Sequence, residues 1–304
     1  MIPLHFSPEI TKARQSGAPI VALESTIITH GMPVPHNLDT ARRAEAVVRA
    51  AGAIPATIAV LNGNLHIGLT DAQLKTLANA RDVAKLSRAD LAMTIANGGT
   101  GATTVAATMI AAHLAGIQVF ATGGIGGVHK GAEATFDISA DLRELAMTPV
   151  TVVCAGAKAI LDLPKTLEVL ETYGVPVIAY GQDDLPAFWS RQSGLKAPLR
   201  LDDPRAIARA HLTRQAMGLA GGQLVTNPIP ADDEIAFNEM QVAVATAIAD
   251  ATSTGVTGKE VTPFLLSRIY DLTAGRSLHA NIALMLNNAR LAAQIAKELT
   301  QERA

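Results

Sequence analysis

Short apolar segments alternate along the chain with longer amphipathic segments, and this alternation predicts the elements of the fold. Continuous apolar runs rich in β-branched residues are typical of strands whose two faces are both covered by helices. We predict strands at residues 20–23, 27–29, 56–61, 66–68, 83–86, 117–121, 150–154, 175–180 and 223–226. We predict helices at residues 39–51, 72–80, 103–115, 165–173, 233–252, 263–274 and 277–299.

The order of these elements indicates the fold class. Strands that alternate with helices predict an α/β fold with a largely parallel or mixed central sheet, and the C-terminal third is mostly helical. Asn62-Gly63-Asn64 predicts a tight hairpin turn. A chain of 304 residues is long enough for two domains of about 150 residues each. Because no repeat or Ser/Pro-rich linker divides it, we expect a single domain over residues 1–304.

Composition narrows the function classes. Aromatic residues make up 3% of the chain and the formal net charge is −2, so neither base stacking nor a global positive field indicates binding to a nucleic acid. The single cysteine excludes an intramolecular disulfide and a Cys-rich zinc site, and with no secretory signal expected at the start we predict a cytoplasmic protein. Residues 91–129 carry no Asp, Glu, Lys or Arg, but two glycine-rich interruptions argue against a membrane span. We interpret this stretch as the buried centre of an α/β domain.

Glu24 interrupts the apolar segment VALESTIITHG. One interpretation is a buried structural acceptor for backbone N–H groups. The other is an acid/base residue at the end of a strand, since burial of a carboxyl group favours its protonated form near neutral pH. The sequence leaves both open.

A glycine-rich segment, Thr122 to Gly131, follows a strong strand signal. It matches neither the dinucleotide-binding Gly-x-Gly-x-x-Gly pattern nor the P-loop pattern. Small residues allow backbone N–H groups to approach an anion, and His129 and Lys130 add donors, so the segment is a candidate phosphate-binding loop. A flexible loop is the alternative.

Two carboxylates, Asp137 and Asp141, lie just ahead of a predicted helix. Asp141 with Glu144 three residues later also fits a helix N-cap. Asp137 has no comparable structural explanation. Carboxylate oxygens favour Mg²⁺ or Mn²⁺ over zinc, and an ion held by so few ligands keeps several waters.

Lys158 closes the uncharged run from residue 145 to residue 157, directly after a predicted buried strand. Partial desolvation there favours the neutral, nucleophilic amine. Cys154 has no activating base nearby in the sequence and is interpreted as strand packing. Asn281 shares a helical stripe with Met285 and Asn288, where the amides either recognise a base edge or cap neighbouring loops. No His-Glu-x-x-His motif indicates a zinc hydrolase.

Taken together, these segments resemble the pseudouridine-5′-phosphate glycosidase family, which is related to indigoidine synthase A. The matching segments are VALESTIITHGMPVPHN, NGGTGATTVAATM, VFATGGIGGVHKGAEATFDISADL, VTVVCAGAKAILDL, NPIP and GKEVTPFLLSRI. They extend over nearly the whole chain. The resemblance implies a three-layer α/β/α sandwich, a homotrimer and a divalent metal ion of the Mn²⁺ type.

The resemblance also implies an activity, the reversible cleavage of the C–C glycosidic bond of pseudouridine 5′-phosphate to uracil and ribose 5-phosphate. By position in the motifs, Glu24 corresponds to the proton donor, Lys158 to the nucleophile and Asp137 to the metal ligand. The substrate-contacting positions of the motifs correspond to Lys85, Val105, His129, Ser139, Ala140, Asp141 and Asn281. The loop 96–100 lacks a lysine that the family pattern carries, so the resemblance leaves the local phosphate contacts open.

The chemistry explains these residue types. A C–C bond to uracil is not broken by protonating an ether-like leaving group, whereas acid-assisted opening of the ribose ring exposes C1 to the Lys158 amine. An imine-type adduct then forms, with Glu24 and Asp141 as the available acid/base groups. A sugar-phosphate or nucleotide kinase, or a non-catalytic nucleotide-binding module, are the alternatives. Release of uracil without ATP separates all three.

Overall fold

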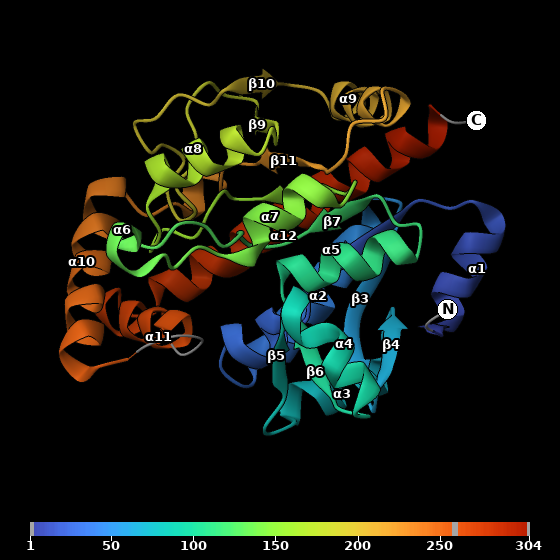
Figure 1. Cartoon of the computed structure of the whole chain (residues 1–304), viewed down its shortest axis with the longest axis horizontal. Helices are drawn as coiled ribbons and strands as arrows, with labels where there is room; N and C mark the ends of the chain where they lie inside the picture. The colour runs from blue at the N-terminus through green and yellow to red at the C-terminus, as the bar shows by residue number, and fades with distance from the viewer. Residues whose placement is uncertain (1–2, 257–260, 303–304) are drawn as a thin grey trace.

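The computed structural model describes residues 3–256 and 261–302, and it shows an α/β fold with helices on both faces of a mixed, mostly parallel sheet (Figure 1). The first three residues of the segment GKEVTPFLLSRI therefore lie outside the described residues. The fold class predicted from the sequence is confirmed.

Seven parallel strands form the main part of the sheet, and their side chains are mostly buried because helices cover both faces. In spatial order they are β3 (Ile54–Leu61), β2 (Ile20–Leu23), β7 (Val119–Ala121), β8 (Thr151–Cys154), β11 (Gln223–Thr226), β9 (Val177–Tyr180) and β10 (Leu199–Leu201). The central strands are in register, so that Val153 of β8 lies between Ala121 of β7 and Val225 of β11.

The sheet changes direction along β3. Its first half pairs with β2, whereas its second half pairs antiparallel with β4 (Asn64–Ile67) and β6 (Gly101–Thr103). Strands β1 (Leu4–Phe6) and β5 (Ala84–Leu86) extend this part in parallel to β4 and β6. The predicted hairpin turn joins β3 to β4, and both Asn62 and Gly63 have the positive φ that such a turn requires.

Helices form the two outer layers. On one face α5 (Val105–Leu114), α7 (Ala140–Met147) and α8 (Leu163–Thr172) lie side by side (Figure 1). On the other face α12 (Arg276–Gln301) crosses β2, β7 and β8 and packs between α2 (His36–Ala50) and α9 (Pro204–Ala216). The remaining helices are α1 (Pro8–Ser16), α3 (Asp71–Asn79), α4 (Arg88–Ala96), α6 (Ala132–Thr135), α10 (Phe237–Thr254) and α11 (Val261–Leu272).

The uncharged stretch 91–129 is divided among α4, β6, α5 and β7, and it supplies much of the buried centre as expected. No helix within the described ranges is both long enough and apolar enough to cross a membrane.

Some sequence predictions were wrong in detail. Residues 27–29 belong to a π-helix, Ile27–Gly31, because the Ser25 carbonyl accepts the N–H groups of Ile28 and Thr29 and turns the chain. Thr103 lies in β6, and α5 begins two residues later, after Thr104 as N-cap.

Several elements were not predicted at all, namely α1, α4, α6, α9, β1, β6 and β10. The strands among them are only three residues long, too short for an alternating pattern to emerge. Helix α9 has a weak pattern because it buries only Ile207, Ala208 and His211.

A buried amide attaches α12 to the ends of the sheet. Asn288 is fully buried (0% exposed), and its Nδ2 donates to the carbonyl of Thr122 at 2.9 Å and points to that of Gly123 at 3.4 Å. Its Oδ1 accepts from Nδ2 of Asn227 at 3.1 Å, and the Asn227 N–H donates to the Cys154 carbonyl at 2.7 Å. Three strand ends, those of β7, β8 and β11, are therefore held to one helix.

Replacing Asn288 by leucine leaves the Thr122 carbonyl and Nδ2 of Asn227 without these hydrogen bonds, so we expect Asn288→Leu to lower the free energy of unfolding by about 2–4 kcal/mol. The neighbouring Asn287 provides a matched control, since it is half-buried and donates one hydrogen bond, to the Pro228 carbonyl at 3.1 Å. Asn287→Leu should cost about 1 kcal/mol. Urea unfolding followed by circular dichroism measures both, and equal losses would contradict the role given to Asn288.

Candidate active site

The chain leaves the neighbouring strands β2 and β7 in opposite directions. From β2 it passes through α2 on one face to reach β3, whereas from β7 it passes through α7 on the opposite face to reach β8. In open α/β sheets the crevice outside the carboxyl ends of the strands at such a switch point is the usual ligand site. Glu24 follows β2 directly, and Thr122 follows β7.

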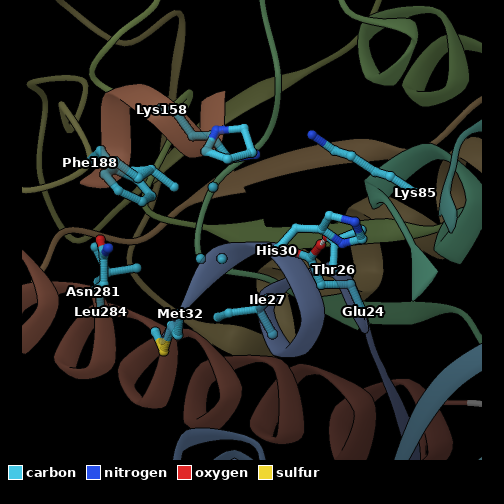
Figure 2. Close-up of a pocket in the computed structure, with 15 residues that line it drawn as sticks. Glu24, Thr26, Ile27, His30, Met32, Lys85, Lys158, Phe188, Asn281 and Leu284 are labelled. Carbon is cyan, nitrogen blue, oxygen red and sulfur yellow. Dashed lines mark hydrogen bonds between the residues drawn. The ribbon is translucent and has the colours of Figure 1, made fainter. Parts of the chain in front are cut away.

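A cavity open to solvent lies at this edge of the sheet (Figure 2). It is lined by Glu24, Thr26, Ile27, His30, Gly31, Met32, Lys85, Gly123, Gly124, Lys158, Phe188, Pro263, Leu266, Asn281 and Leu284. Four residues predicted from the sequence, far apart in the chain, thus meet in one place: Glu24, Lys85, Lys158 and Asn281. Figure 2 shows Lys158 beside Phe188, with Glu24, Thr26 and His30 grouped across the cavity.

Glu24 is 7% exposed, and its two carboxylate oxygens accept from two hydroxyl groups. Thr122 donates to Oε1 and Thr26 donates to Oε2. The residue thus lines the cavity, and among the described residues its carboxylate is held by side chains and not by backbone N–H groups. This arrangement is suited to a positioned acid/base group.

Lys158 reaches the cavity through a loop that continues the pairing of β7 with β8. The Ile125 N–H donates to the Gly156 carbonyl, and the Lys158 N–H donates to the Ile125 carbonyl, both at 3.1 Å. The side chain is half-buried, and its Nζ forms no hydrogen bond or ion pair with any residue that the structure describes. An amine in this setting is available to react with a bound molecule.

Cys154 lies at the end of β8, fully buried behind this loop. Burial raises the pKa of its thiol to about 12, so the thiolate is not formed near neutral pH. The structure therefore agrees with Cys154 as strand packing.

The glycine-rich segment is a packed wall and not a flexible loop. A side chain at Gly124 would lie 2.6 Å from the Phe188 ring, so only glycine allows this close approach. The N–H groups of Ile125, Gly126, Val128 and His129 all donate to acceptors within the protein. These four amides are thus not available to an anion, whereas Gly123 and Gly124 line the cavity.

Asp141 does not line the cavity and is 6% exposed. Its Oδ1 accepts from the N–H of Ala106 at 3.0 Å, and its Oδ2 accepts from the N–H of Gly126 at 2.8 Å. The carboxylate therefore holds the first turn of α5 against the glycine-rich segment. The N-cap of α7 is Ser139 instead, while the fully buried Glu144 pairs with Arg88 at 2.6 Å.

Two further residues that were predicted to contact the substrate lie at or beside the first turn of α5. Val105 is the first residue of this helix and is buried, and Lys85 on β5 pairs with Ala102 of β6, just before the helix. A helix N-terminus beside a lysine favours the binding of an anionic group.

Asp137, His129 and Lys130 lie away from the cavity lining, on the segment that precedes α7. The Asp137 side chain is 52% exposed, and its Oδ2 is 3.9 Å from Nδ1 of His129. Within residues 3–256 and 261–302 no group of three His, Cys, Asp or Glu side chains could hold a metal ion. The donor set fits only a cation that keeps most of its waters.

Lys130 and Ala140 are exposed, and Lys130 borders a second cavity at the start of α8.

The two asparagines of the predicted stripe on α12 lie in different surroundings. Asn281 lines the cavity, whereas Asn288 caps carbonyl groups at the sheet ends. The structure thus supports the capping alternative for Asn288, and it places Asn281 at the cavity.

Sequence reasoning missed Thr26, His30, Met32, Phe188 and Leu284. The first three lie on or beside the π-helix, which the sequence suggested to be a strand. Single π-helical turns are frequent at functional sites, and the polar pair Ser25-Thr26 ahead of an apolar segment was the available signal.

Comparison with known proteins places these features in context. The family model for "Indigoidine synthase A like protein" matches residues 9–298. A protein of Jannaschia sp. (strain CCS1) called pseudouridine-5′-phosphate glycosidase is 69% identical over 299 residues, 98% of this chain and 99% of that protein. One of the same name from Roseobacter denitrificans is 67% identical over 298 residues, 98% and 96% of the two chains.

Solved structures show the same fold. A prealnumycin C-glycosynthase in complex with ribulose 5-phosphate has a TM-score of 0.91 at 40% identity, covering 99% of this chain and 98% of the other. An indigoidine synthase A-like protein of Thermotoga maritima has a TM-score of 0.88 at 32% identity, covering 98% and 97%.

Proposed function

The chain belongs to the indigoidine synthase A like protein family, and from this premise we propose that it catalyses the reversible cleavage of the C–C glycosidic bond of pseudouridine 5′-phosphate. The products are uracil and ribose 5-phosphate. The observation that carries the proposal is that one cavity contains both a lysine amine with no hydrogen bond to a described residue and a buried carboxylate held by two hydroxyl groups.

Lys158 is the proposed nucleophile. Protonation of the ribose ring oxygen lets its bond to C1 break, and the Lys158 amine adds to C1 and loses a proton. Protonation of the uracil ring carbon then breaks the C–C bond as the C=N bond of an imine forms. Water hydrolyses the imine, which returns the amine and releases open-chain ribose 5-phosphate.

Glu24 is the proposed proton donor, because it is the carboxyl group that lines the cavity and its orientation is fixed by Thr26 and Thr122. Asp141 was the second acid/base candidate. Since both of its oxygens accept backbone N–H groups, the geometry favours a positioning role for it, at the junction of α5 and the glycine-rich segment.

The phosphate is proposed to bind near the first turn of α5, through Lys85, the backbone at Val105 and the segment Ser139-Ala140-Asp141. Lys85 borders the cavity, and Asp141 joins the last segment to the helix. His129 and Lys130 are the outer cationic groups of this region.

A divalent cation, most simply Mn²⁺, is proposed to bind Asp137 with water at its other positions. When bound, such an ion offsets the negative charge of the substrate phosphate. We also propose that the protein is a homotrimer, on the basis of the family resemblance. We propose a cytoplasmic location because its single cysteine is not in a disulfide.

The function is tested by incubating the enzyme with pseudouridine 5′-phosphate in the absence of ATP and measuring the released uracil by chromatography. Pseudouridine without the phosphate is the matched control substrate. Each lost charge-assisted hydrogen bond costs about 1.5–3 kcal/mol, so kcat/KM should fall by about a hundredfold or more. Phosphorylation of either compound in the presence of ATP, or no uracil from either, would refute the proposal.

Borohydride added during turnover should reduce the imine, inactivate the enzyme and add a ribose-phosphate mass to the peptide that contains Lys158. Lys158→Arg keeps the charge without a readily deprotonated amine, so it should fold and bind substrate but not cleave it. Cys154→Ala, four residues earlier on the same strand end, is the control and should retain activity. Substantial cleavage by Lys158→Ala would exclude the covalent mechanism.

Asp137→Ala should abolish the stimulation of activity by Mn²⁺ while circular dichroism shows an intact fold, because its side chain is exposed and forms no buried contact. Asp162→Ala, which removes another acidic side chain near Lys130, is the comparison and should keep the metal response. Full activity of Asp137→Ala in the presence of a chelator would show that this residue holds no required ion.

A further inference from the structure

We propose that Trp189 determines base specificity by fixing the orientation of the Asn281 carboxamide, so that the cavity presents an N–H donor to a carbonyl oxygen of the base and disfavours an amino group there. This inference rests on the proposed function, since it concerns the base that the enzyme releases. Trp189 is not part of the cavity lining and acts through Asn281, as a positioning residue.

The hydrogen bond between these two side chains has only one possible direction. Trp189 Nε1 lies 2.6 Å from Asn281 Oδ1. An indole N–H donates and cannot accept, so the atom of the carboxamide that faces it must be the oxygen. A reversed carboxamide would place its NH₂ group against the indole N–H and leave both donors without an acceptor.

The indole cannot move to accommodate such a reversal. Trp189 is 1% exposed, its carbonyl accepts the N–H of Ile235 at 2.9 Å, and its ring packs edge-on against Phe188 with 5.0 Å between ring centroids. The N–H of Phe188 donates to the Ala155 carbonyl at 3.1 Å, which joins this turn to the loop of Lys158. Phe188 also has a φ of +63°, a strained value that the surrounding contacts must maintain.

The other end of the carboxamide faces the cavity. Asn281 is half-buried on α12, and its side chain rises from the helix toward Phe188 in Figure 2. Its Nδ2 forms no hydrogen bond with any residue in the described part of the chain. The cavity therefore receives a fixed donor, whereas a carboxamide free to rotate could offer either a donor or an acceptor.

This arrangement distinguishes uracil from its amino analogues. Uracil carries carbonyl groups at C2 and C4, cytosine has an amino group at C4, and isocytosine has one at C2. An amino group placed against the Asn281 NH₂ leaves two donors unpaired, so at least one of these analogues should bind about tenfold or more weakly than uracil.

The chain contains a single tryptophan, which allows a substitution without loss of volume. Global replacement of tryptophan by its benzothienyl analogue exchanges the indole N–H for sulfur at Trp189 alone. Replacement by 5-fluorotryptophan, which keeps the N–H, is the matched control. Inhibition constants of uracil, cytosine and isocytosine against the cleavage reaction are then compared among the three enzymes.

We expect the ratio of the inhibition constants, disfavoured base over uracil, to fall by about tenfold in the benzothienyl enzyme and to stay unchanged in the fluorinated one. An unchanged ratio in a benzothienyl enzyme that still cleaves substrate would overturn the proposal, as would a native enzyme that does not discriminate. If no enzyme cleaves pseudouridine 5′-phosphate, the proposed function fails by itself, and calorimetric binding of the three bases decides the specificity question separately.

A second variant tests the same geometry from the other side. Asn281→Asp keeps an oxygen for the indole N–H and turns a second oxygen, an acceptor, toward the cavity. The preference should then shift from the carbonyl base to the amino base that the native enzyme disfavours. Retention of the native order of the three bases by Asn281→Asp would contradict the assigned orientation.

Discussion

The fully buried carboxamide of Asn288 is the contact on which the arrangement of the site depends. Backbone carbonyls at the carboxyl ends of parallel strands have no further strand to pair with, and burial makes each unpaired one costly. Asn288 satisfies such groups at the end of β7 and, through Asn227, connects them to the end of β8. One helix is thereby fixed relative to the strand ends that carry the reactive groups.

This attachment brings together residues that are far apart in the chain. Glu24 and Lys158 come from strand ends, where the geometry is set by the sheet, whereas Asn281 comes from α12, two turns before Asn288. The same helix, α12, binds the strand ends through Asn288 and places Asn281 at the cavity. The packing of the core therefore sets the distance between Asn281 and the residues at the strand ends. A change in the core at Asn288 therefore reaches the cavity directly.

Carboxylates in this region serve unequal purposes, and their hydrogen-bond partners tell them apart. Asp141 accepts two backbone N–H groups and joins loop to helix, while Glu144 is buried against Arg88. Glu24 accepts from two hydroxyl groups, whose oxygens can also accept a hydrogen bond from a bound molecule. Asp137 remains exposed and is available to a hydrated cation. Burial alone does not distinguish the first three.

The sequence by itself determined the α/β class, the buried character of residues 91–129 and the choice of Glu24 and Lys158, which line one cavity, since each depends on local pattern or on a polar residue within an apolar run. Tertiary structure alone decided that Asp141 faces backbone amides, that four amides of the glycine-rich segment donate within the protein, and that Trp189 donates to Asn281. The physical reason is the same in each case. A residue's type and neighbours fix what it is able to donate or accept, but its partner comes from a distant segment that only the packed fold brings within hydrogen-bonding distance.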